Sequence, residues 1–207
     1  MKKILCLLII NFISIFTFSQ SDEKFGVSSN TIPSGLHVGD NAPAFKSIDQ
    51  NGEKFDLLEE LKSNTVVILF YRGNWCPVCN RYLKSFVDSL QLIQDKGAQV
   101  VAVTPNAYEG VNSMSKKLNN QLTIISDTSN QLMNQYKVSF NVTDDYQKKI
   151  EKALSTNIAE SNNQKRAKLP VPATYIIDKT GKIHWKQFDL NYKNRASVKS
   201  IINNLPD

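Results

Sequence analysis

The fold is decided by residues 65–83, which read TVVILFYRGNWCPVCNRYL. The run Thr65–Tyr71 is continuously β-branched and aromatic, which is typical of a strand covered on both faces. Pro77 suits the first position of a helix, where its missing N–H would have no partner anyway. Apolar residues then recur at helical spacing as far as Lys96-Gly97, where glycine favours a stop. The stretch therefore predicts a buried strand, a short loop and one helix.

Two cysteines stand where this strand and helix meet. Cys76 falls at the helix N-terminus, where the dipole and the unpaired N–H groups favour thiolate over thiol. Cys79 follows one turn later, placed to attack a mixed disulfide or a sulfenic acid on Cys76. We therefore expect Cys76 to be the nucleophile and Cys79 to form a redox disulfide with it. An inert disulfide and an unreactive buried pair remain alternatives, although a bond across so short a loop stabilises little.

Turn signals and apolar runs on both sides of this stretch indicate an α/β domain. Before it, residues 45–48 and 54–57 flank Asn51-Gly52 and predict a hairpin, followed by a helical turn. The runs after it predict strands at 98–104, 122–126, 173–177 and 182–188, and helices at 109–118, 130–136 and 195–205. Such alternation favours one mixed sheet flanked by helices, with parallel pairing early and an antiparallel hairpin late.

The N-terminus is typical of a secretory signal. Lys2 and Lys3 precede an apolar stretch, and small residues stand at the expected cleavage site, so residues 1–19 are expected to be removed. Cys6 would leave with them. The mature chain is then exported to the periplasm or another extracytoplasmic space. An uncleaved membrane anchor is the alternative.

Two polar segments complete the predicted organisation. Residues 20–37 lack any periodicity and are expected to form a flexible lead-in to a domain at 38–207. Residues 141–168 are polar and lysine-rich, with weak helical periodicity. We expect them to form an insertion that packs at the rim of the domain.

The composition excludes several classes of function. The chain has 207 residues, 41% hydrophobic and 21% charged, which suits one globular domain. Its net charge of +6 is not gathered into a basic run, so no nucleic-acid partner is expected. A zinc site needs about two ligands beyond the cysteine pair, and only His37 and His184 are at hand. We expect no metal, no other cofactor and no stable membrane span after signal cleavage.

Three segments of the chain resemble the AhpC/TSA peroxiredoxin-like proteins of the thioredoxin superfamily. They are VGDNAPAFKSIDQNGEKFDL at 38–57, FYRGNWCPVCNRYL at 70–83 and LPVPATYIIDKTGKIHW at 169–185. The resemblance implies a thioredoxin-like fold with an N-terminal hairpin extension. It also implies that Cys76 is the peroxidatic cysteine and Cys79 the resolving one, and that Pro172 is a cis-proline facing their disulfide.

The chain departs from that family's pattern in three places. Typical members carry Pro and Thr or Ser seven and three positions before the peroxidatic cysteine, where this chain has Leu69 and Gly73. The usual family arginine is also missing near the late strand. Arg72 and Arg81 flank the cysteines and are candidates to replace it. Trp75 is expected to shield the disulfide and to contact the partner.

Two enzymatic functions follow. In the first, the thiol pair reduces hydroperoxides and is recycled by a thioredoxin-like reductant. In the second, the chain resembles the exported TlpA/ResA-like oxidoreductases and acts on protein disulfides. A non-catalytic interaction or redox-sensing module is a third interpretation.

Overall fold

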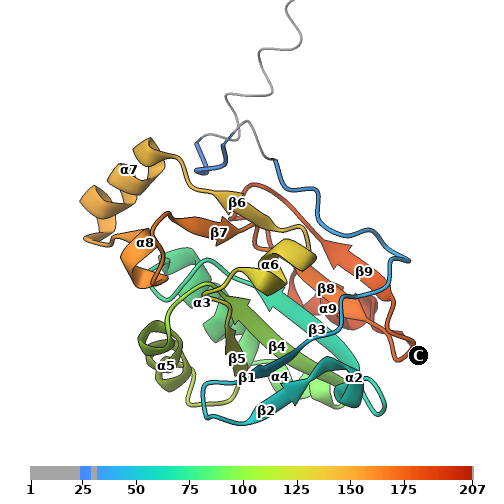
Figure 1. Cartoon of the computed structure of the whole chain (residues 1–207). Helices are drawn as coiled ribbons and strands as arrows, with labels where there is room; N and C mark the ends of the chain where they lie inside the picture. The colour runs from blue at the N-terminus through green and yellow to red at the C-terminus, as the bar shows by residue number, and fades with distance from the viewer. Residues whose placement is uncertain (1–23, 29–31, 207) are drawn as a thin grey trace, which may run out of the picture.

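A five-stranded mixed sheet forms the centre of the structure, a computed structural model that describes residues 24–28 and 32–206 (Figure 1). Its strands are β3 (Thr65–Phe70), β4 (Ala98–Thr104), β5 (Thr123–Ser126), β8 (Thr174–Ile177) and β9 (Ile183–Gln187). They lie in the order β5-β4-β3-β8-β9. β3, β4 and β5 are parallel, whereas β8 pairs antiparallel with β3 and β9. The predicted change from parallel to antiparallel pairing is confirmed.

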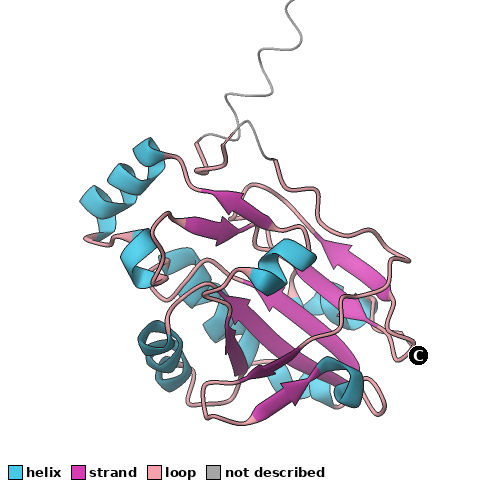
Figure 2. Cartoon of the chain, viewed as in Figure 1, coloured by secondary structure: helices cyan, strands magenta, loops and turns pink. Residues whose placement is uncertain are grey.

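Helices cover both faces of the sheet (Figure 2). Those with side chains in one core cluster are α3 (Pro77–Val87), α4 (Leu90–Gln94), α5 (Tyr108–Lys117) and α9 (Val198–Asn203). Those with side chains in the other are α2 (Leu57–Glu60), α6 (Gln131–Gln135), α7 (Asp144–Leu154) and α8 (Ile158–Ser161). Two cores separated by a buried sheet are the expected result of a strand that is apolar on both faces.

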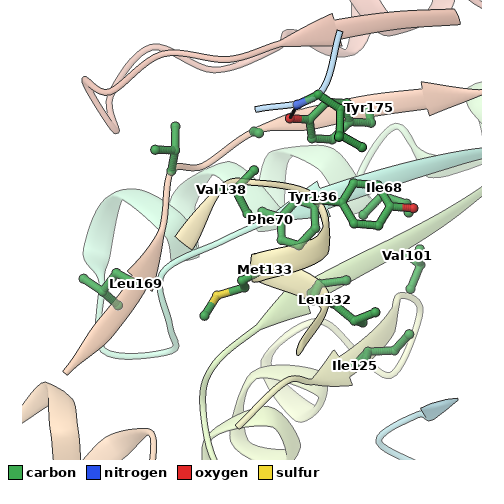
Figure 3. Close-up of a cluster of buried hydrophobic side chains, with 14 of the residues drawn as sticks. Ile68, Phe70, Val101, Ile125, Leu132, Met133, Tyr136, Val138, Leu169 and Tyr175 are labelled. Carbon is green, nitrogen blue, oxygen red and sulfur yellow. Dashed lines mark hydrogen bonds between the residues drawn. The ribbon is translucent and has the colours of Figure 1, made fainter. Parts of the chain in front are cut away.

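The central strand β3 supplies both cores because successive side chains point to opposite faces. Ile68 and Phe70 join the cluster that Figure 3 shows, in which Phe70 lies 5.3 Å from the ring of Tyr136. Val67 and Leu69 join the opposite cluster, which also holds both cysteines. The thiols therefore belong to one of the two hydrophobic cores.

Two predicted hairpins are confirmed. β1 (Lys46–Ile48) pairs antiparallel with β2 (Lys54–Asp56), and β8 pairs antiparallel with β9. Gly181, at φ +82°, closes the turn between β8 and β9, since its N–H donates to Asp178 O at 2.9 Å. A left-handed backbone of this kind favours glycine.

The predicted helix over 77–96 is wrong in one respect, because it is two helices. α3 ends at Val87 and α4 begins at Leu90. Ser89 between them has φ −122° and ψ 9°, outside the helical region. Aspartate and serine compete with the helix for backbone hydrogen bonds, which makes Asp88-Ser89 a natural break.

The last helix is also shorter than predicted. α9 begins after Ser197, whose Oγ accepts from the N–H of Ser200 at 3.0 Å. Residues such as serine are strong N-caps. Arg195, expected inside the helix, instead lies in the loop before it.

The polar insertion is an ordered part of the domain. It holds α7 and α8, which lie at one end of the sheet (Figure 1). A small antiparallel pair, β6 (Ser139–Asn141) with β7 (Lys168–Pro170), closes its base and was not predicted.

The predicted lead-in contacts the domain at described residues that include Val27 and Leu36. Val27 forms a bridge with Val142, and the Leu36 N–H donates to Tyr175 Oη at 3.1 Å. The predicted signal at 1–19 lies outside the described residues. Within the described ranges, no helix is long and apolar enough to cross a membrane.

Candidate functional site

The two thiols lie in the first turn of α3, directly after the loop that leaves β3. Cys76 is the N-cap residue, with an extended backbone at φ −86° and ψ 110°, and Pro77 opens the helix. This is the placement that the sequence predicts. Both sulfurs are free and buried, since Cys76 is 2% and Cys79 0% exposed.

The loop before Cys76 depends on one glycine and one asparagine. Gly73 has φ +148°, and a Cβ there would lie 2.5 Å from Trp75 Nε1. Asn106, just beyond β4, accepts from the Asn74 N–H through Oδ1 at 2.7 Å. Its Nδ2 donates to Asn162 Oδ1 at 3.1 Å. The buried side chain of Asn106 thus joins the cysteine loop to the insertion.

Arg72 is a buried cation at the centre of the site. It is 1% exposed, and its Nη2 donates to the hydroxyl of Tyr146 from α7. Its Cζ lies 4.1 Å from the ring centroid of Tyr192, 5.0 Å from that of Trp75 and 5.2 Å from that of Tyr146. Its Nε and Nη1 have no hydrogen-bond partner among the described residues. Two guanidinium donors therefore remain free beside the thiols.

A second arginine contacts the thiol pair directly. Arg195 Nη2 donates to Cys79 Sγ at 3.3 Å. Its Nε donates to the Tyr192 carbonyl at 2.9 Å, and its Cζ lies 5.0 Å from the Tyr82 ring. The sequence did not single out Arg195. Tyr146 and Tyr192 were missed as well, because a tyrosine in a polar segment gives no signal of what it will cover.

The pKa values of the two thiols shift in opposite directions. Burial raises the pKa of Cys79, but the hydrogen bond with Cys76 and the charges of Arg195 and Arg72 outweigh it and lower the pKa to about 5. The hydrogen bond with Cys79, together with burial, raises the pKa of Cys76. These pKa shifts favour the thiolate at Cys79, whereas the sequence predicts that Cys76 is the more acidic.

The other predicted site residues divide into those near the thiols and one away from them. Trp75 is half-buried and packs against both hydrophobic cores and Arg72. Arg81 is exposed and faces α5, where it lines a hollow with Met114 and Lys117. It is not part of the site.

Pro172 lies beside the end of β3, since the Phe70 N–H donates to Ala173 O at 2.8 Å, but the expected cis-proline is wrong. Within 24–28 and 32–206 there is no cis peptide bond. The Ala173 N–H donates to Val171 O at 2.7 Å, which closes a three-residue turn around Pro172. The central residue of an inverse γ-turn needs φ near −75°, which the ring of proline favours.

The described residues offer no group of three or more metal-ligating side chains. A hollow between α3 and the segment before α9 is lined in part by Val78, Tyr82 and Arg195, the arginine that contacts Cys79. The surroundings of the pair are therefore aromatic and cationic.

The model of the AhpC/TSA family matches residues 38–186. A chloroplastic peroxiredoxin Q of Populus jackii is 28% identical over 109 residues, 53% of this chain and 51% of that protein. The chain thus spans about half the length of that relative. The chloroplastic peroxiredoxin Q of Triticum aestivum is 23% identical over 93% of this chain and 78% of its own.

Solved structures share the fold. Peroxidoxin BcpB from Mycobacterium tuberculosis superposes with a TM-score of 0.59 at 18% identity, covering 74% of this chain and 86% of that one. A PrxQ mutant from Xylella fastidiosa gives a TM-score of 0.63 at 14% identity, over 82% and 95%. These likenesses confirm the thioredoxin-like fold.

Proposed function

Because the chain belongs to the AhpC/TSA family, we propose that it is a thiol peroxidase that reduces hydroperoxides through Cys76 and Cys79. One observation carries the proposal: two adjacent reduced thiols share a buried site with a guanidinium that has unused donors. The family's relatives are named peroxiredoxins, which supports the same chemistry.

The arrangement suits peroxide chemistry for an electrostatic reason. A thiolate attacks the terminal oxygen of R–O–OH, and negative charge develops on the departing RO⁻. Arg72 is buried, and its Nε and Nη1 are free to donate to that oxygen. A cation in a site that excludes water stabilises such charge more than it would in bulk solvent.

The second sulfur completes the cycle. It displaces hydroxide from the sulfenic acid and forms the Cys76–Cys79 disulfide, which stops further oxidation. We propose that a thioredoxin-like dithiol then reduces the disulfide. Trp75, half-buried beside the pair, is placed to contact that partner. We also propose that residues 1–19 direct export and are removed, which N-terminal sequencing of the secreted chain tests.

The test is the rate of reaction of the reduced protein with hydrogen peroxide. Rapid mixing is followed by the fluorescence of Trp75, which lies against Arg72 and packs on the core cluster that holds the thiols. A Trp75→Phe variant separates this signal from that of Trp185. The control is the double variant Cys76→Ser/Cys79→Ser. We expect a reaction far faster than that of a free thiol, and its loss in the double variant.

The same reduced protein is tested against the disulfides of insulin. A slow reaction with peroxide combined with fast reduction of insulin would mean that the chain is a protein-disulfide reductase and not a peroxidase. That outcome would keep the thiol pair and change only the substrate.

A further inference from the structure

We infer that Cys79 is the sulfur that attacks, that Cys76 resolves, and that Arg195 is the positioning residue that holds the attacking thiolate. This inference rests on the thiol peroxidase activity proposed above. It assigns the two sulfurs the reverse of the roles that the sequence predicts.

The contact of Arg195 is the first observation. Its Nη2 lies 3.3 Å from Cys79 Sγ, whereas no guanidinium hydrogen bond to Cys76 occurs among the described residues. A charge-assisted hydrogen bond to sulfur stabilises thiolate and not thiol. The positive charge is therefore placed to favour ionisation at Cys79.

The closeness of the two thiols adds to this contact. Their interaction lowers the pKa of Cys79 and raises that of Cys76. Two sulfurs in one buried site do not both ionise readily, because like charges repel. The reduced site thus holds one thiolate, at Cys79, and one thiol, at Cys76.

Neither exposure nor the helix dipole separates the two. Both sulfurs are almost fully buried, and both lie in the first turn of α3. Facing Cys79 are Arg72 from the loop after β3, Arg195 from the loop before α9, and Tyr71 at the end of β3. Burial raises the pKa of Tyr71, so its hydroxyl stays neutral. The two sulfurs therefore differ in the contact with Arg195, which only Cys79 makes.

Arg195 is fixed in place before any substrate arrives. Its Nε is used by the Tyr192 carbonyl at 2.9 Å, and its plane lies over Tyr82 of α3 at 5.0 Å. Ser197 caps α9 only two positions later, which holds the loop. The Nη2 group is thus oriented toward sulfur by contacts that do not involve the sulfur.

The reaction balances as follows. The Cys79 thiolate attacks the terminal oxygen of R–O–OH, an S–O bond forms, the O–O bond breaks, and RO⁻ leaves and takes a proton from water. Cys79 is oxidised to sulfenic acid and the peroxide is reduced to the alcohol. Cys76 then loses its proton, its sulfur displaces hydroxide from Cys79, and water leaves as the disulfide forms. A thioredoxin-like dithiol returns both thiols.

The decisive experiment compares Cys76→Ser with Cys79→Ser after full reduction. Thiolate absorbance near 240 nm is titrated against pH, and sulfenic acid formed with hydrogen peroxide is trapped with dimedone and located by mass spectrometry. We expect Cys76→Ser to keep a thiolate well below the ordinary pKa and to trap dimedone at Cys79. Cys79→Ser should show neither. A low-pKa thiolate and a trapped sulfenic acid in Cys79→Ser alone would overturn the assignment.

Arg195→Gln and Arg195→Lys test the positioning role in the Cys76→Ser background. A charge-assisted hydrogen bond corresponds to a change of about tenfold or more in the acid dissociation constant. We expect the glutamine variant to raise the pKa of Cys79 accordingly and the lysine variant to restore part of the shift. An unchanged titration with a lowered melting temperature would make Arg195 merely structural.

The two proposals fail in different ways. If the chain is not a peroxidase, dimedone trapping is slow in every variant, while the titrations still locate the thiolate. If the titrations place it on Cys76, the peroxide reaction of the unmodified protein is unaffected and only the assignment is lost.

Discussion

Replacing the buried Arg72 by methionine should change the free energy of unfolding little. It should slow the reaction with peroxide markedly. The side chain is 1% exposed, yet among the described residues it has no ion pair, and two of its nitrogens lack partners. A methionine of similar length fills the same space without a charge. The free energy of unfolding then depends on which of these terms is larger.

The magnitudes nearly cancel. Arg72→Met loses contacts with three rings, at about 0.5–1 kcal/mol each, and one charged hydrogen bond to Tyr146, at about 1.5–3 kcal/mol. It also removes two unpaired buried N–H groups, each of which costs about 1–3 kcal/mol. We expect the net change to lie within about 2 kcal/mol of zero.

The assay is urea unfolding of the fully reduced proteins at neutral pH, followed by circular dichroism. Phe86→Ala is the benchmark, because Phe86 is 0% exposed in the same core and its truncation should cost about 3–5 kcal/mol. In parallel, Arg72→Met should raise the pKa of Cys79 and slow its reaction with peroxide. A loss of more than about 4 kcal/mol in Arg72→Met would refute the reasoning, since Arg72 would then be a structural residue.

Three further outcomes are expected. Gly73→Ala should lower the free energy of unfolding by about 1–3 kcal/mol and alter the fluorescence of Trp75. The reason is that Gly73 has φ +148° and that a Cβ there would lie 2.5 Å from the indole of Trp75. An unchanged fluorescence spectrum would contradict this expectation. Asn106→Ala should lower the free energy of unfolding in urea by about 1–3 kcal/mol. It should also speed amide hydrogen exchange in both the cysteine loop and α8, since Asn106 is hydrogen-bonded to both segments. Faster exchange in the loop alone would contradict this shared role of Asn106. The reduced protein should gain stability relative to Cys79→Ser as the pH rises from about 5 toward the ordinary cysteine pKa of 9.0. The lowered pKa of Cys79 in the folded state stabilises that state as the thiol ionises, and this gain is lost when the pH falls through about 5. Parallel pH profiles of the two proteins in urea unfolding would exclude a thiolate at Cys79.

The parts of the fold that local pattern determines were predictable. The β-branched run at Thr65–Phe70 is a buried strand, and Pro77 places Cys76 at a helix N-cap. Periodicity could not reveal the break at Asp88-Ser89, because apolar residues keep their helical spacing across it. The strand pair β6–β7 brings 139–141 beside 168–170, a long-range pairing that no local pattern records.

The electrostatics of the site were not predictable, because Arg195 reaches Cys79 from the far end of the chain. One signal was nevertheless present. Seven and three positions before Cys76, where the family would carry Pro and Thr, the chain has Leu69 and Gly73. Seven and three positions before Cys79 it has Arg72 and Cys76, so that a thiol stands where the family has a hydroxyl.

The position of Arg195 bears on how relatives of this chain should be grouped. The family match covers 38–186 and stops short of it, so two chains can score alike whether or not they carry an arginine there. If the acidity of Cys79 depends on this contact, subfamilies that differ at position 195, in the loop before the last helix, will differ in working pH. A C-terminal tag or fusion that displaces α9 would also displace Arg195 and change the acidity of Cys79. Such chains should therefore be compared without a tag at the C-terminus.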